Sequence, residues 1–165
     1  DISWHLIGHL QSNKVRQAVS AAAMIESVDT LKLLRMIDAE ALAQGRTIDC
    51  LLQGQIASEE TKSGFSVDEI EETSWKDVAG SLRAVRICGL MGMATFTDNI
   101  QKVGAEFRKL SVLFSRLRDN HFRGIIHFRE ISMGMSGDWQ VAVGEGSTMI
   151  RVGTLIFGER IIKSR

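Results

Sequence analysis

The chain has 165 residues, of which 44% are hydrophobic, a length and composition suited to one globular domain with a substantial core. Lysine plus arginine and aspartate plus glutamate both number 20, so no basic excess points to nucleic acid, an anionic membrane or an acidic partner. No apolar run approaches the roughly 18 residues that span a bilayer, and the first residues lack a signal-peptide pattern. These features predict a single-domain, soluble, cytoplasmic protein.

Short apolar runs rich in β-branched residues alternate with longer stretches of helical period, which is typical of βα units and a parallel sheet. Several of these runs are apolar on consecutive residues, as expected for strands buried on both faces. In chain order the pattern predicts a strand over 4–8, a helix over 12–20, a strand over 24–28, a helix over 30–44, a strand over 48–57, a helix from 66 towards 75, a strand over 85–93, a helix over 99–118, a strand over 128–134, a short helix after 138 and a strand over 149–157.

The two long helices carry apolar stripes at spacings of three and four, which predicts that these faces pack on the sheet. Ser66 and Glu69 form a capping-box pattern for the helix between them. Two architectures fit the alternation of strands and helices: a doubly wound sheet, or an eight-stranded barrel from which two βα units are absent. The stripe of the last long helix consists of Val103, Phe107, Leu110, Leu113, Phe114 and Leu117.

Cys50 and Cys88 each lie in an apolar, strand-like run, where a free thiol behaves as a small buried hydrophobe, so no disulfide is predicted. His5 and His9 are four residues apart but straddle the end of a strand, and no third ligand has a recognisable spacing, so no metal site is predicted. Proline and tyrosine are both absent, which fits either an unusual natural sequence or an altered one.

Glycine, serine and threonine concentrate after the last two predicted strands, over residues 132–138, 146–148 and 151–154. In a barrel these loops commonly hold phosphate, because glycine permits close backbone approach and N–H and hydroxyl groups donate to the anion. The same residues also serve as ordinary turns and caps. Arg151 stands within an apolar strand, where it is a ligand contact at the barrel mouth, an outward-facing residue under a helix or a member of a structural ion pair.

Several long motifs occur in order along nearly the whole chain. They are Trp4-His5-Leu6-Ile7-Gly8-His9-Leu10-Gln11-Ser12-Asn13-Lys14, Glu59 to Phe65, Cys88-Gly89-Leu90-Met91-Gly92-Met93-Ala94, Ser132-Met133-Gly134-Met135-Ser136 and residues 146–158. Together these motifs closely resemble the YggS/PROSC family of pyridoxal-phosphate homeostasis proteins. The resemblance implies the C-terminal three quarters of a (β/α)8 barrel similar to the N-terminal domain of alanine racemase, here with six βα units over residues 1–165 and incomplete at the N-terminus.

The implied cofactor is pyridoxal 5′-phosphate, bound without established turnover. Cofactor contacts are implied at Ser132, Met133, Ser136, Gly153 and Thr154, of which Ser132, Gly153 and Thr154 hold the phosphate and Ser136 is a weaker phosphate candidate. Arg151 is implied as the partner of the pyridine nitrogen. The family's Schiff-base lysine has no counterpart in this chain, because Lys14 and Lys62 match other family positions. Asp49 stands where proline is common, and residues 53–55 replace a bulkier strand residue.

The function that follows from this resemblance is a cofactor carrier or buffer in vitamin B6 and amino-acid homeostasis, with no catalytic residues, and either a monomer or a homo-oligomer. A racemase-like enzyme is the alternative, although the tyrosine base of alanine racemases has no counterpart in this chain. A second alternative is a truncated or engineered barrel fragment that binds no cofactor.

Overall fold

The computed structural model describes residues 1–58 and 63–159, and these residues form one sheet in which all strand pairs are parallel. The order β1-β2-β3-β4-β5-β6 follows the chain without a reversal. A doubly wound sheet reverses its strand order at a switch point, so this order identifies the barrel alternative as the correct one. The strands are β1 (His5–Leu6), β2 (Met24–Val28), β3 (Ile48–Gly54), β4 (Val85–Gly92), β5 (Glu130–Met135) and β6 (Met149–Arg151).

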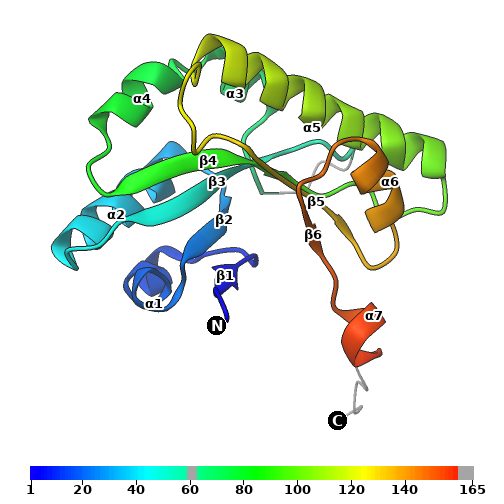
Figure 1. Cartoon of the computed structure of the whole chain (residues 1–165), viewed down its shortest axis with the longest axis horizontal. Helices are drawn as coiled ribbons and strands as arrows, with labels where there is room; N and C mark the ends of the chain where they lie inside the picture. Colours follow the sequence, from blue (N-terminus) through cyan, green and yellow to red (C-terminus); the bar gives the residue numbers. More distant parts are fainter. Residues whose placement is uncertain (59–62, 160–165) are drawn as a thin grey trace.

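The sheet curls into an arch, with α3, α4 and α5 over its outer side and α7 towards its open side (Figure 1). Each strand therefore has a convex face under helices and a concave face turned inward, as in half of a barrel. The helices are η1 (Ser12–Lys14), α1 (Val15–Ala21), α2 (Leu31–Ala43), α3 (Val67–Glu72), α4 (Trp75–Ser81), α5 (Ile100–Asn120), α6 (Trp139–Gly144) and α7 (Thr154–Phe157).

Side-chain caps set where the predicted helices begin. The Thr30 hydroxyl accepts from the N–H of Leu33 at the start of α2, and Ser66 and Glu69 form the predicted capping box at the start of α3. The helix predicted from 66 towards 75 is in fact two helices, because Thr73 is extended and ends α3. The chain then turns so that the buried indole of Trp75 donates to the carbonyl of Ile70 at 2.7 Å.

The larger hydrophobic core lies between the sheet and the helices. The predicted stripe of α5 is buried there in full, and the ring of Phe128 stacks on Phe122 with 4.0 Å between centroids and on Phe114 with 5.0 Å. Cys50 belongs to this core, and Cys88 lies in a smaller cluster with Met24, Leu51 and Met91. Both thiols are free and buried, as predicted.

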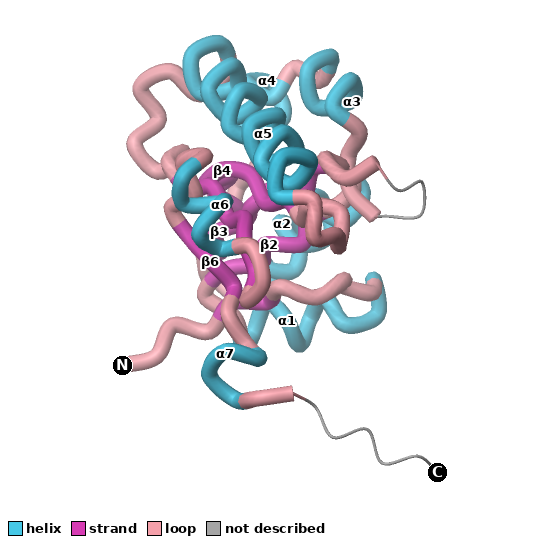
Figure 2. Tube along the Cα trace, turned by 90° about the vertical axis from the view of Figure 1, so that its right-hand side faces the viewer, coloured by secondary structure: helices cyan, strands magenta, loops and turns pink. Residues whose placement is uncertain are grey.

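The prediction of a strand over 149–157 is wrong beyond Arg151, because Thr154–Phe157 forms the short helix α7. A short apolar run has no period that separates a buried strand from a helix. Leu155, Ile156 and Phe157 are largely exposed, and Figure 2 shows α7 standing apart from the strands. Within the described ranges, no helix combines the length and apolar character needed to cross a membrane.

Candidate functional site

A cavity of about 590 Å³ lies at the carboxyl ends of β4, β5 and β6. Its walls come from the loop after β4 (residues 93–98), the end of β5 with the loop after it (residues 134–138), Phe107 on α5 and the segment from Arg151 into α7. Ligands of parallel α/β folds bind at this end of the strands, where the loops converge. The volume is within the range of small-molecule sites, which makes this cavity the candidate binding site.

One corner of the cavity joins the loops after β5 and β6. The backbone N–H of Gly153 donates to the Ser136 hydroxyl at 3.1 Å, and Thr154 is the exposed first residue of α7. No side chain of the described residues caps α7; the N–H groups of Thr154 and Leu155 have no partner among the hydrogen bonds of the described residues, whereas those of Ile156 and Phe157 donate to the carbonyl of Gly153. Hydroxyl and amide donors therefore converge at one point, which suits an anion such as phosphate.

Arg151 lies on the concave face of the arch and borders the same cavity. The residue is 9% exposed; Nη1 donates to the Ser132 hydroxyl at 2.6 Å and Nη2 to the carbonyl of Gly92 at 2.9 Å. Burial lowers the pKa of Arg151, and the nearby charges of Glu26 and Asp138 act in the opposite direction. Since the guanidinium faces inward, the alternative of an outward residue under a helix does not apply.

Ser132 and Met133 do not line the cavity. Ser132 is completely buried on the concave face, where its hydroxyl donates to Glu26 Oε2 at 2.5 Å. The Met133 side chain is completely buried in the core under the helices, so a cofactor contact from this residue would have to come from its backbone. Of the implied contacts, the structure brings Ser136, Arg151, Gly153 and Thr154 together.

Two buried carboxylates near this site were not predicted. Glu26 lies in the apolar strand β2 at 1% exposure, so the signal used for Arg151, a charge in an apolar run, would also have found it. Glu106 lies on the buried face of α5 between Val103 and Phe107. A carboxylate within an apolar helical stripe is a comparable signal, because burial of a charge requires partners.

The Glu106 carboxylate ties two loops at the carboxyl ends of the strands to α5. It accepts from the N–H and hydroxyl of Thr95 at 2.7 and 2.8 Å, and from the N–H and hydroxyl of Ser58 at 3.2 and 2.9 Å. Burial alone would raise the pKa of Glu106, but these hydrogen bonds outweigh it and the pKa is lowered. Thr95 belongs to the cavity wall, so Glu106 supports that wall from behind.

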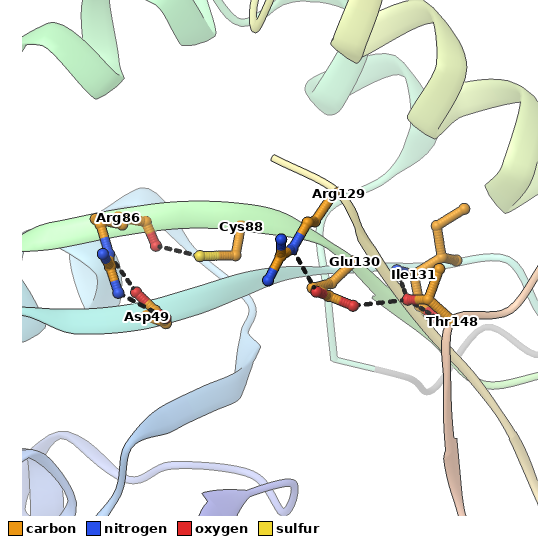
Figure 3. A network of polar contacts seen from close by, with 7 residues as sticks. All are labelled: Asp49, Arg86, Cys88, Arg129, Glu130, Ile131 and Thr148. Carbon is orange, nitrogen blue, oxygen red and sulfur yellow. Dashed lines mark hydrogen bonds and ion pairs between the residues drawn. The ribbon is translucent and has the colours of Figure 1, made fainter. Parts of the chain in front are cut away.

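A second set of charges lies nearer the amino ends of the strands, away from the cavity (Figure 3). Asp49 accepts from Arg86 Nε at 2.6 Å and Nη2 at 2.9 Å, which accommodates an acidic residue at this position of the strand. Glu130 accepts from Arg129 and from the Thr148 hydroxyl, and that hydroxyl accepts in turn from the N–H of Ile131. The Asp49–Arg86 contact links β3 to β4, and the contacts of Thr148 link β5 to the start of β6, so both stabilise the sheet.

His5 and His9 have separate partners. His5 Nδ1 lies 2.9 Å from Glu26 Oε1, and His9 Nδ1 lies 3.2 Å from Asp29 Oδ2. Within residues 1–58 and 63–159, no three histidine, cysteine or acidic side chains are grouped so that they could hold a metal ion. Of the motif Glu59 to Phe65, residues 59–62, including Lys62, lie outside the described residues.

Comparison with curated proteins gives consistent relatives. The chain is 36% identical over 160 residues to the pyridoxal phosphate homeostasis protein of Aquifex aeolicus, a match that covers 97% of this chain and 68% of that protein. The protein of the same name from Escherichia coli K12 is 31% identical over 159 residues, with 96% of this chain and 65% of the relative covered.

Solved structures agree with this result. PipY of Synechococcus elongatus, solved without pyridoxal phosphate, superposes with a TM-score of 0.88 at 35% identity over 96% of this chain and 72% of that one. PipY with pyridoxal phosphate bound gives a TM-score of 0.84 at 34% identity over 96% and 71%. Alanine racemase of Clostridium difficile has a TM-score of 0.72 at 12% identity over 98% and 41%, which shows a common fold.

The fold and the cavity are those of a parallel α/β barrel protein. Residues 2–161 match the family described as "Alanine racemase, N-terminal domain". Within this class, the chain belongs to the pyridoxal phosphate homeostasis protein family. It spans about two thirds of the length of the curated relatives that it matches.

Proposed function

We propose that this protein binds pyridoxal 5′-phosphate and acts as a carrier or buffer of the cofactor in vitamin B6 and amino-acid homeostasis, without turnover. The observation that carries the proposal is the cavity at the carboxyl ends of β4 to β6, with an anion-binding corner and a buried guanidinium on its border. A relative with 34% identity has been solved with pyridoxal phosphate bound, which supports the same ligand here.

The residues present fit the cofactor's chemistry. The phosphate carries two negative charges, and the hydroxyls of Ser136 and Thr154 and the N–H groups of Thr154 and Leu155 offer hydrogen bonds to its oxygens. The apolar part of the cavity, which includes Met93, Phe96 and Phe157, offers surface to the ring. When bound, pyridoxal phosphate supplies a reactive aldehyde and an electron-accepting ring.

Arg151 supports a storage role over catalysis. A permanent cation beside the ring nitrogen disfavours protonation of that nitrogen, and the ring then withdraws electrons less strongly. The pocket would hold the cofactor and activate it poorly. Residence in the cytoplasm and the absence of nucleic-acid and membrane partners stay predictions of the sequence.

The proposal is tested by equilibrium dialysis of the protein against pyridoxal 5′-phosphate and, separately, against inorganic phosphate. Thr154→Val should weaken both ligands roughly tenfold, the loss expected for one hydrogen bond to a charged group. Thr47→Val is the matched control, because Thr47 is exposed in the loop before β3, at the end of the sheet away from the cavity. Failure of the unmodified protein to bind pyridoxal phosphate would contradict the proposal.

The fold shared with alanine racemase makes a racemase-like enzyme the second candidate. A racemase-like function predicts that the protein loaded with pyridoxal phosphate interconverts L-alanine and D-alanine. Carrier function predicts no interconversion above the rate of free cofactor, measured by chiral chromatography over the same period.

A further inference from the structure

A continuous series of polar contacts crosses the concave face of the arch from one edge strand to the other. Arg151 on β6 donates to the Ser132 hydroxyl on β5 at 2.6 Å, and that hydroxyl donates to Glu26 Oε2 on β2 at 2.5 Å. The other oxygen of Glu26 lies 2.9 Å from Nδ1 of His5 on β1. The four side chains thus connect β6, β5, β2 and β1.

The central contact of this series depends on the curl of the sheet. β3 and β4 separate β2 from β5 in the strand order, yet Glu26 and Ser132, which are 106 residues apart, are in hydrogen-bond contact. Both side chains are almost completely shielded from solvent, with exposures of 1% and 0%. Two opposite charges, on Arg151 and Glu26, therefore share one buried hydroxyl between them.

A buried hydroxyl between two charges has a fixed orientation. Ser132 has one proton to donate, and its hydrogen bond goes to the carboxylate of Glu26. A lone pair of the Ser132 oxygen is then turned towards the guanidinium of Arg151. The second amino group of Arg151 donates to the carbonyl of Gly92 on β4. Contacts on two sides fix the plane of the guanidinium, and Glu26 supplies the negative charge that its burial requires.

The hydrogen bond to Glu26 makes Ser132 unsuited to the phosphate contact that the family resemblance implies. Its proton is used for Glu26, so the hydroxyl has none to donate to a phosphate oxygen, and the adjacent carboxylate repels a dianion at this position. The Ser136 hydroxyl lies at the cavity corner, accepts from the N–H of Gly153 and keeps its own proton, and it has no carboxylate contact among the hydrogen bonds of the described residues. The groups suited to bind phosphate, at the cavity corner, are thus different from those that contact the buried charges of Glu26 and Arg151.

We propose that Glu26 and Ser132 are positioning residues, which hold the Arg151 guanidinium for the ring of the cofactor, and that Ser132 is not a phosphate contact. The proposal rests on the proposed function, because it assigns the ring end and the phosphate end of the same ligand to different residues. Glu26 acts through Ser132 and does not itself reach the ligand.

The test compares pyridoxal 5′-phosphate with inorganic phosphate as ligands of Glu26→Gln, Ser132→Ala and the double variant. Each single variant should weaken pyridoxal phosphate roughly tenfold, the loss of one charge-assisted hydrogen bond, and leave inorganic phosphate within about twofold. The double variant should be no weaker than either single variant, because both residues act on the same guanidinium. Glu72→Gln, an exposed change on α3, is the matched control and should alter neither ligand.

Equal weakening of both ligands by Ser132→Ala would make Ser132 a phosphate contact and overturn the proposal, as would additive losses in the double variant. The orientation of Arg151 is also measured without any ligand, from the ¹⁵N signals of its guanidinium. Restricted rotation in the unmodified protein should be lost in both single variants, and unchanged signals would refute the positioning role. Failure of the unmodified protein to bind pyridoxal phosphate would refute the proposed function, and the NMR result would still decide whether Glu26 and Ser132 orient Arg151.

Discussion

The carboxylate of Glu106 accepts two hydrogen bonds from Thr95, one from its backbone N–H at 2.7 Å and one from its hydroxyl at 2.8 Å. Two further bonds from Ser58 reach the same carboxylate. Glu106 is 2% exposed, so these four donors replace water around a buried charge. The loops after β3 and β4 are thereby tied to the longest helix of the fold directly behind the candidate site.

Replacement of Glu106 by leucine should destabilise the protein by about 3 kcal/mol, because four donors lose their acceptor and the two from Thr95 are buried. Glu106→Gln should cost less, because one amide oxygen still accepts. Urea unfolding at pH 7 measures both losses. Glu145→Gln is the control, since Glu145 pairs with Arg108 on an exposed part of α5, and its effect should be much smaller. Equal losses for Glu106→Leu and the control would contradict the role of Glu106.

The same carboxylate predicts a dependence of stability on acid. Its pKa is lowered in the folded protein from the ordinary value of 4.5, so the unfolded chain takes up this proton first as the pH falls. The stabilisation by ionised Glu106 is therefore complete above about pH 4.5 and is lost as the pH falls through the lowered pKa. Urea unfolding between pH 7 and pH 3 should show a difference between the unmodified protein and Glu106→Gln that shrinks in acid. A difference in unfolding free energy that stays constant from pH 7 to pH 3 would contradict this role of the Glu106 charge.

Replacement by alanine should have opposite effects on stability at two glycines, Gly89 and Gly80. Gly89 on β4 has φ +151°, and a Cβ there would lie 1.8 Å from the carbonyl oxygen of Glu130 on β5. Gly89→Ala should therefore destabilise the protein by at least about 3 kcal/mol. Gly80 lies within α4 with nothing within 4 Å of its Cβ position, so Gly80→Ala should stabilise by about 0.5–1 kcal/mol. Thermal unfolding of both variants, followed by circular dichroism, gives the comparison.

The two cysteines should be inert in the native protein. Burial, followed by the charge of Asp49, raises the pKa of Cys88 to about 12, and burial likewise raises the pKa of Cys50. The reactive thiolate is thus scarce at pH 8, and the reagent has little access to either sulfur. Ellman's reagent should release no colour from the folded protein at pH 8 and two equivalents in concentrated guanidinium chloride. Rapid reaction of one thiol without denaturant would contradict the burial of that residue.

Much of the architecture could be predicted from local pattern. The six strands were found because buried parallel strands are apolar on consecutive residues, and α5 because its apolar residues recur every three or four positions. Arg151 was singled out because a charge in an apolar strand needs a partner, and the structure gives it two, Ser132 and Gly92. Local pattern failed at Thr154–Phe157, where four residues are too few to show a period.

The sequence by itself determined the βα alternation, the faces of the helices that are buried and, through its motifs, the family of the protein. These features depend on residues close together in the chain, whose spacing fixes which side of an element is apolar. The tertiary structure decided the partners of the buried charges. Glu26 meets Ser132 because the sheet curls until two non-adjacent strands face each other, and Glu106 meets Thr95 because α5 packs across the end of β4. No local spacing encodes either distance, so the polar interior of the site follows from the curled shape of the sheet.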